Sequence, residues 1–302
     1  MACEEGGSAV ERGWTWDPTL YAGSAVHYAA GRVAYPPQLA TALVDALDLH
    51  GTGRLLDVGC GPGSLTLLLA PHVAQAIGID PDPDMLAEAE RLSREERLTN
   101  TIWRQLRGED LPADLLPVDL VTFAQSFHWM DRRRVAAAAH GLLTPAGALV
   151  HVHATTHQGT SEATEELHGA GGDLALPRPP WVAITGLVRR YLGPQPRAGL
   201  SVLPSGIRGG DEAAIYRGAG FTGPDELNVP GRRIQRTAEQ VVAAVHSLSS
   251  AAPHLFGDRL DAFDTDLRHL LTTVRSDGCF GEEMPSIDVD IWRPAGSNPV
   301  TA

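Results

Sequence analysis

The residues best placed for chemistry early in the chain are an aspartate and three glycines at alternate positions. Asp57, Gly59, Gly61 and Gly63 stand between two apolar runs. Glycine has no Cβ, so the backbone of such a loop can approach a ligand closely. A dinucleotide fingerprint would require glycine at position 64, where the chain has serine. A Walker loop would require a lysine, and the sequence contains none. The loop therefore favours a different ligand.

Two carboxylates indicate the character of that ligand. Asp57, two positions before the first glycine, favours an ammonium or sulfonium cation and would repel a pyrophosphate. Asp80 ends the apolar run of "AIGIDPDPDML", where a carboxylate can accept both hydroxyl groups of a ribose. The two acids together predict a ligand with an amino-acid-like cation and a ribose.

Two histidines follow predicted strands and are candidate general bases. His128 stands in "SFHWMD" and His157 in "ATTHQG", at the sheet edge where open α/β folds bind ligands. The pKa of imidazole suits proton transfer near neutral pH. The alternative is that His128 and Trp129 wall the pocket and that His157 is an ordinary loop residue.

We expect no metal site and no disulfide. His151 and His153 share one face of a strand by the period of two, and we expect them to pack or to bond internally. No carboxylate cluster accompanies them in the sequence, which argues against zinc. The cysteines, which we expect to be reduced thiols, form no CxxC pair: Cys3, Cys60 and Cys279.

The elements that must position these residues alternate between strands and helices. The predicted strands are 54–58, 75–79, 101–104, 118–123 and 147–154. The predicted helices between them are 63–70, 82–94 and 131–142. Such alternation is typical of a doubly wound α/β fold with a parallel sheet and helices on both faces. The alternating segment 286–292 is predicted to be a last edge strand.

The chain resembles the class I S-adenosylmethionine-dependent methyltransferases. The segments that carry the resemblance, in order, are "LLDVGCGPG", "AIGIDPDPDMLAEA", "RGEDLP", "VDLVTFAQSFHWMD" and "LLTPAGALV". They cover residues 20–157 roughly, and the "FHW" loop is similar to a small-molecule branch of the family. The resemblance implies a Rossmann-like seven-stranded sheet with an antiparallel last strand, S-adenosylmethionine as cofactor, S-adenosylhomocysteine as product and no metal.

The resemblance also implies a cofactor-binding set. Its residues are Tyr28, Arg32, Asp57, Gly59, Gly61, Gly63, Asp80, Met85, Glu109, Asp110, Ala124 and Gln125. Asp57 and the glycines line the methionine end, and Tyr28 and Arg32 approach the methionine carboxylate. Asp80 holds the ribose and Met85 packs on the adenine. Either Glu109 or Asp110 meets the adenine edge.

For the acceptor, the candidate catalytic residues are Tyr21, His128 and His157. The substrate pocket is predicted to include Tyr21, Phe127, Trp129, His157, Trp181, Tyr191 and Phe221. Aromatic walls suit an apolar or aromatic small molecule. The alternative is that most of these aromatic residues form the core of a cap.

The predicted organisation has six parts. They are a flexible tail (1–16), N-terminal helices that close the cofactor site (17–50), the cofactor-binding core (51–157), an insertion that forms the acceptor pocket (158–210), the C-terminal part of the core (211–293) with two cap helices (236–275), and a second tail (294–302).

Charge and hydropathy limit the kinds of partner that the protein can have. The net charge of −13 argues against a nucleic-acid partner, since phosphates attract basic proteins. No apolar run reaches the length of a membrane helix, and Glu4 and Glu5 stand where a secretory signal would be basic. We therefore expect a cytoplasmic protein with a small-molecule substrate. Whether it forms a homo-oligomer through the N-terminal helix stays open from the sequence.

Several functions stay open from the sequence. The resemblance implies methyl transfer to a small organic acceptor in bacterial secondary metabolism. Similarity to teleocidin-type enzymes makes C-methylation of a prenyl alkene with cyclisation of the carbocation an alternative. A noncatalytic S-adenosylmethionine-binding protein is a second alternative. A nicotinamide oxidoreductase is disfavoured by Ser64 and Asp57.

Overall fold

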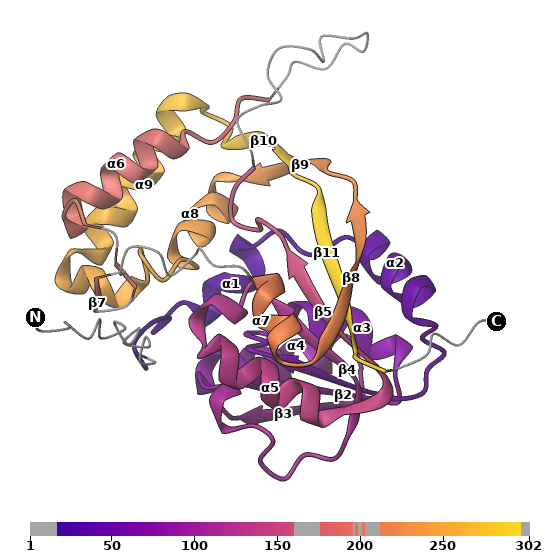
Figure 1. Cartoon of the computed structure of the whole chain (residues 1–302). Helices are drawn as coiled ribbons and strands as arrows, with labels where there is room; N and C mark the ends of the chain where they lie inside the picture. The colour runs from indigo at the N-terminus through magenta and orange to yellow at the C-terminus, as the bar shows by residue number, and fades with distance from the viewer. Residues whose placement is uncertain (1–16, 160–175, 196, 199–200, 203–211, 297–302) are drawn as a thin grey trace, which may run out of the picture.

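A seven-stranded sheet forms the centre of the molecule (Figure 1). The computed structural model describes residues 17–159, 176–195, 197–198, 201–202 and 212–296. The strands are β1 (Arg54–Val58), β2 (Gln75–Asp80), β3 (Thr101–Gln105), β4 (Val118–Ala124), β5 (Leu143–His153), β8 (Phe221–Val229) and β11 (Ile287–Pro294). Their order is β3-β2-β1-β4-β5-β11-β8. Because β11 pairs antiparallel with both β5 and β8, it alone reverses the direction of the sheet. The predicted doubly wound α/β sheet is confirmed.

Helices cover both faces of this sheet. On one face, α2 (Pro37–Leu47) and α3 (Ser64–Leu69) bury leucines against β1, β4 and β5. On the other, α5 (Arg132–Leu142) and α7 (Glu212–Gly218) bury Val135 and Tyr216 against Phe123. Residues of β1 divide between the two clusters, Leu55 in one and Leu56 in the other, as the period of two in a strand requires. The strands of the centre are thus buried on both sides.

The remaining elements of the core connect its layers, and a polar side chain caps the first turn of one helix among them. Helix α4 (Pro83–Glu95) begins at Asp82, whose carboxylate accepts hydrogen bonds from the backbone of Asp84 at 2.9 Å and Met85 at 3.3 Å. Three short 3₁₀ helices follow strands or helices of the core: η1 (Ala70–His72), η2 (Gly108–Asp110) and η3 (Phe127–Trp129).

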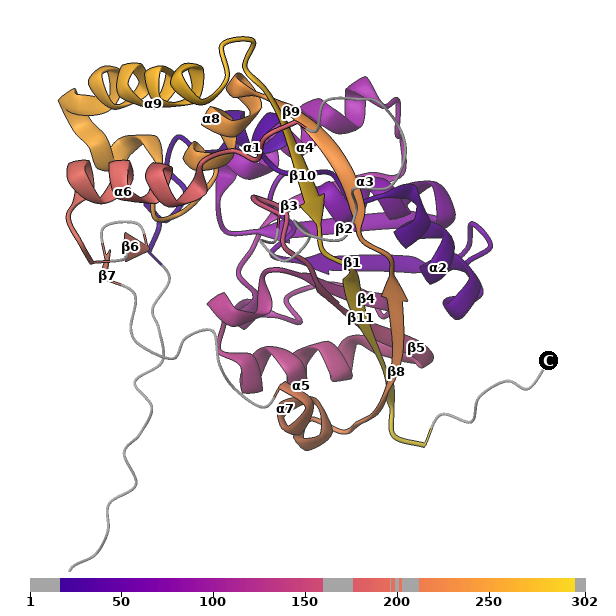
Figure 2. The same cartoon turned by 90° about the horizontal axis from the view of Figure 1, so that it is seen from above.

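A helical cap stands beside the sheet (Figures 1 and 2). It contains α6 (Trp181–Leu192), α8 (Ala238–His246), η4 (Pro253–Arg259) and α9 (Leu260–Val274). Ile184, Val241, Phe263 and Leu267 are buried in its own apolar cluster. Two antiparallel strands, β9 (Arg232–Thr237) and β10 (Cys279–Met284), lead into and out of the cap. A short pair, β6 (Arg197–Ala198) and β7 (Ser201–Val202), completes the described strands.

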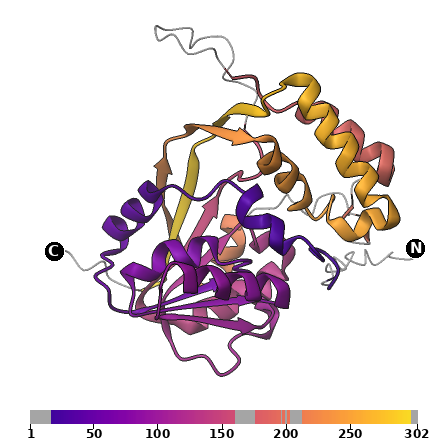
Figure 3. The same ribbon diagram turned by 180° about the vertical axis from the view of Figure 1, so that it is seen from behind.

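The N-terminal helix α1 (Ala25–Gly31) packs on the cap helix α8, and the two lie side by side in Figure 3. A Cβ at Gly31 would lie only 2.3 Å from the backbone carbon of Ala243, so glycine permits this close approach. The hydroxyl group of Ser24 donates to the carbonyl of His246 at 2.8 Å. Helix α1 is therefore fastened to the cap.

Two predictions about strands were wrong or incomplete. The last strand, β11, is not an edge strand but lies between β5 and β8. β9 and β10 were not predicted, and β5 begins at Leu143 rather than at 147. The expected tail 1–16 lies outside the described residues, as do 160–175 and 203–210 of the expected insertion and 297–302 of the second tail. Among the described helices, none is both long enough and apolar enough to cross a membrane.

Candidate cofactor and active site

A cavity with an empty volume of about 1000 Å³ lies where β1, β2 and β4 end. This position is the carboxyl edge of the parallel strands, where doubly wound folds bind ligands. Many residues expected from the sequence line it: Tyr21, Tyr28, Arg32, Asp57, Gly59, Gly61, Asp80, Met85, Glu109, Ala124, Gln125 and Trp129. The fold thus gathers residues from four of the five segments that carry the family resemblance and from the N-terminal helix region.

The glycine loop is held against β2 and leaves bare backbone at the cavity. The N–H groups of Gly59 and Cys60 donate to the carbonyl of Ile79 at 2.8 and 3.0 Å. Gly61 lines the cavity in the left-handed region, with a φ of 54°, and a Cβ there would meet no described atom within 4 Å. The space beside Gly61 is therefore open to a ligand.

Gly63 has a different role. It is the N-cap of α3, with a φ of 82°, and a Cβ there would lie 2.6 Å from the Trp103 ring. Gly63 is not among the described residues that line the cavity. Its requirement for glycine comes from packing, not from ligand contact.

Asp80 is aimed into the loop at the end of β2. One carboxylate oxygen accepts a hydrogen bond from the N–H of Gly61 at 2.9 Å, and the other accepts from the N–H of Asp82 at 2.9 Å. Only 9% of the residue is exposed. Burial raises the pKa of Asp80 to about 7, although the two N–H groups oppose the shift. The carboxylate is fixed in position and titrates near neutral pH.

Asp57 is buried more completely. Its two oxygens accept hydrogen bonds from the hydroxyl groups of Thr66 at 2.6 Å and Thr122 at 2.8 Å. Burial raises the pKa of Asp57, and these hydroxyl groups oppose the shift. Burial, with the nearby Asp80 and Asp57 charges, raises the pKa of the Cys60 thiol well above its usual range. Cys60 is therefore a neutral wall residue and not a nucleophile.

Helix α1 and the turn after it close one side of the cavity. Arg32 donates through Nε to the hydroxyl of Ser247 and through Nη2 to the Ser247 carbonyl, both at 2.9 Å. Its guanidinium lies 4.8 Å from the centre of the Tyr28 ring. Both residues line the cavity, so the cap sets the position of two predicted cofactor contacts.

The structure distinguishes the two carboxylates expected at the adenine edge. Glu109 lines the cavity, and one of its oxygens accepts a hydrogen bond from the N–H of Asp131 at 2.9 Å. Asp110 is exposed and is not among the described lining residues. Beside Glu109, the Nε atom of Arg107 is buried and has no hydrogen-bond partner among the described residues.

Several expected site residues lie elsewhere in the described structure. Phe127 and Phe221 are buried in the core under α5 and α7, and Trp181 and Tyr191 pack in the cap. These four were predicted as substrate contacts, but apolar packing occupies their rings. The ring of His128 lies beside that of Trp129 in a tilted arrangement, with ring centres 4.8 Å apart, and the carbonyl of His157 accepts a hydrogen bond from Arg236 at 2.9 Å. Neither histidine is among the described residues of the cavity wall, so of the three catalytic candidates the wall includes Tyr21.

Other lining residues were not predicted. They are Val33, Tyr35, Cys60, Ser64, Leu65, Pro81, Arg107, Gly108, Ser126, Met130 and Thr156. Most stand next to a residue that was predicted, so adjacency within the quoted segments was the available signal. Thr156 stands next to His157, which was predicted, and the N–H of Val33 donates to the Thr156 carbonyl at 2.7 Å.

Comparison with known proteins places the chain in a family. Residues 55–147 match the family model described as a methyltransferase domain. An uncharacterized methyltransferase of Mycobacterium tuberculosis is 33% identical over 171 residues, which span 54% of this chain and 67% of that protein. A probable S-adenosylmethionine-dependent methyltransferase of Saccharomyces cerevisiae is 35% identical over 126 residues, 40% of this chain and 42% of the yeast protein.

Among solved structures, a putative type II methyltransferase from Anaeromyxobacter dehalogenans is 20% identical, with a TM-score of 0.48 over 87% of this chain and 97% of that one. The mycobacterial relative, the matched domain and the sheet order with its strand-end cavity agree. The chain belongs to the class I S-adenosylmethionine-dependent methyltransferases.

Proposed function

We propose that this enzyme binds S-adenosylmethionine in the cavity described above and transfers its methyl group to a small organic acceptor. The observation that carries the proposal is the open space at Gly61, bounded by the fixed carboxylate of Asp80. A side chain at Gly61 would fill the space that a ligand needs.

The residues of the wall fit the parts of this cofactor. In this proposal Asp80 accepts the ribose hydroxyl groups and Met85 offers an apolar surface for the adenine, and both residues line the cavity. Asp57 and Arg32 face the cavity from opposite elements, with charges that suit the ammonium and carboxylate of the methionine portion. The cofactor supplies an activated methyl group on a sulfonium.

The reaction requires little acid or base chemistry from the protein. Holding two reactants in line can contribute about 7–11 kcal/mol, whereas a general base contributes about 10²–10⁴-fold in rate, or about 3–5 kcal/mol. A wall in which neither His128 nor His157 takes part is consistent with positioning as the dominant effect. Tyr21, at the cavity, is the described candidate for orienting the acceptor.

The wall supports an apolar or aromatic acceptor. Tyr21, Tyr28, Tyr35 and Trp129 line the cavity, together with Met130. Such side chains recognise apolar surface and leave few polar groups to satisfy. The resemblance to natural-product enzymes favours an acceptor from secondary metabolism.

The same aromatic wall favours C-methylation of an alkene as a second candidate. A carbocation formed by methyl transfer would be stabilised by the ring faces, at about 0.5–2 kcal/mol for each well-placed ring. Isolating the methylated product and locating the new methyl group by NMR separates the two candidates. A methyl group on oxygen or nitrogen would exclude this second candidate.

The test of the cofactor site is a calorimetric titration with S-adenosylhomocysteine. Asp80→Ala is expected to raise the dissociation constant at least tenfold, because two hydrogen bonds to the ribose are lost. Asp45→Ala, an exposed carboxylate on α2, is the control and should leave the constant unchanged. An unchanged constant in Asp80→Ala would contradict the assignment. Binding without turnover of labelled methyl donor over a metabolite panel would favour a noncatalytic protein.

A further inference from the structure

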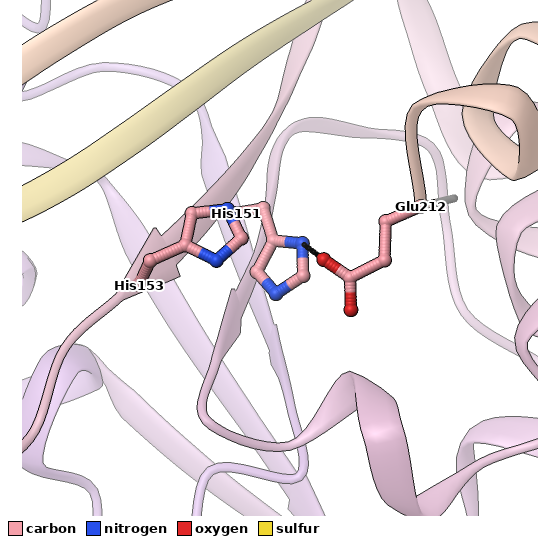
Figure 4. A group of neighbouring side chains, drawn as sticks. All are labelled: His151, His153 and Glu212. Atoms are coloured by element: carbon pink, nitrogen blue, oxygen red, sulfur yellow. Dashed lines mark ion pairs between the residues drawn. The ribbon is translucent and has the colours of Figure 1, made fainter. Parts of the chain in front are cut away.

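Three potential metal ligands meet outside the cofactor cavity: His151, His153 and Glu212 (Figure 4). Their ligand atoms all lie within 4.8 Å of one another. The Nδ1 atom of His151 is 3.4 Å from the Glu212 carboxylate. None of these three residues is among those that line the cavity, so the cluster is a separate feature of the described structure.

The cluster is built by the sheet and one helix. His151 and His153 are two residues apart on β5 and therefore lie on the same face. Their ring centres are 4.2 Å apart. Glu212 begins α7, which packs over the same face of the sheet. The side chains of His151, His153 and Glu212 are 6%, 38% and 29% exposed. The cluster is therefore buried at His151 and open to solvent at His153 and Glu212.

Neighbouring groups complete the surroundings of the two histidines. The Nε2 atom of His153 lies 3.2 Å from the carboxylate of Asp290 on β11. A carboxylate beside a ligating histidine orients the ring and makes it more basic. The hydroxyl of Tyr216 lies 3.1 Å from Nδ1 of His151. A metal ion at that nitrogen would replace this hydrogen bond.

We propose that His151, His153 and Glu212 bind a Zn²⁺ ion that ties α7 to β5. Two imidazoles and one carboxylate are a nitrogen and oxygen set that suits zinc, whereas Mg²⁺ and Ca²⁺ prefer oxygen ligands alone. Ligands at about 2.1 Å from a tetrahedral ion lie about 3.4 Å apart. The His151–Glu212 distance already has this value. Three protein ligands leave one coordination position for water or another ligand.

The experiment uses the full chain after removal of metal with a chelator. Titration with Zn²⁺ is expected to show one ion per chain with a micromolar or lower dissociation constant, and a rise in Tm. Co²⁺ should give visible absorption bands typical of a tetrahedral site. His153→Ala and Glu212→Gln are each expected to weaken Zn²⁺ binding at least tenfold. Both side chains are partly exposed, so circular dichroism should show the parent fold.

Two matched controls and one further variant make the test specific. His50→Ala and Glu96→Gln remove an exposed histidine and an exposed glutamate elsewhere, and should leave the constant unchanged. Tyr216→Phe removes the competing hydroxyl and should keep or tighten binding. Failure of the parent chain to bind one Zn²⁺ would overturn the proposal. So would equal weakening in the controls, or lost binding in Tyr216→Phe.

Discussion

At the scale of single residues, the titration of Asp80 should be visible in cofactor binding. Burial raises its pKa to about 7, and the ionised carboxylate accepts hydrogen bonds that the protonated form cannot. The dissociation constant for S-adenosylhomocysteine is therefore expected to fall by about tenfold between pH 6 and pH 8. Calorimetry across this range measures the effect. Asp80→Asn should abolish the pH dependence, and a parent chain with a constant affinity over the range would contradict the role.

The same pKa shift has the opposite sign for stability. Because the pKa of Asp80 in the folded state lies above that of an aspartate in an unfolded chain, the protonated carboxyl favours the folded state. The contribution is complete below the unfolded pKa and is lost as pH rises through about 7. Asp80→Asn removes this dependence without introducing a charge. In the cofactor-free protein, the free energy of unfolding should fall less with rising pH in the variant than in the parent.

Residues close together in sequence were predicted better than residues gathered by the fold. Gly61 and Asp80 were assigned because each directly follows a recognisable strand. The environment of His151 was not predicted, because Glu212 reaches this histidine only when α7 packs on the sheet. Phe221 was expected at the substrate because aromatic residues suit pockets, but the same ring suits a core equally well. Residue type alone does not distinguish these two roles.

At the scale of elements, the contact between α1 and α8 is expected to affect the proposed cofactor site, because Tyr28 and Arg32 line the cavity. Gly31→Ala would place a Cβ 2.3 Å from backbone atoms of α8, which cannot move away cheaply. We expect the helix to shift, carrying Tyr28 and Arg32 with it, and the dissociation constant for S-adenosylhomocysteine to rise at least tenfold. Calorimetry and methyl-transfer assays measure the loss.

Gly186→Ala is the matched control for Gly31→Ala. Gly186 lies inside α6, and a Cβ there would meet no described atom within 4 Å. Alanine should stabilise that helix by up to about 1 kcal/mol, with cofactor affinity unchanged. If Gly31→Ala bound the cofactor as tightly as Gly186→Ala does, α1 would not be a determinant of the site.

The order of the strands in the sheet could not be predicted from local sequence patterns. The alternation in β11 predicted a strand correctly, but which strands it pairs with depends on β8 and β5, far away in the sequence. β9 reads "RRIQRT", a charged stretch that does not look like a strand. It becomes one because β10 supplies its hydrogen bonds and because Arg236 finds a buried partner. Long-range pairing of this kind has no signal in a single sequence.

At the scale of the whole molecule, one buried ion pair joins α1, the cap and the segment that follows β5. Arg236 and Glu282 lie 3.1 Å apart, with side chains 3% and 0% exposed. Arg236 also donates to carbonyls of Gly31 in α1, of Gln240 in α8, and of His157 after β5. Glu282 accepts from the indole of Trp181 in α6 at 2.6 Å and from the N–H of Gly159 at 2.9 Å. The pair is thus shared by α1, the segment after β5, the cap helices α6 and α8, and the strands β9 and β10.

Removing one partner of this pair should therefore loosen the whole molecule. Arg236→Ala leaves the Glu282 carboxylate buried without its counter-charge, and we expect a loss of about 3–5 kcal/mol in the free energy of unfolding. Arg233→Ala on the same strand removes an ion pair with Glu283 whose arginine is 65% exposed, and should cost at most about 1 kcal/mol. Denaturant unfolding of the two variants measures both values. Equal small losses would show that the sheet, α1 and the cap hold together without the buried pair. A large loss confined to Arg236→Ala would support its role. Partial recovery of stability in the double variant Arg236→Met with Glu282→Leu would establish that the cost comes from the unpaired carboxylate.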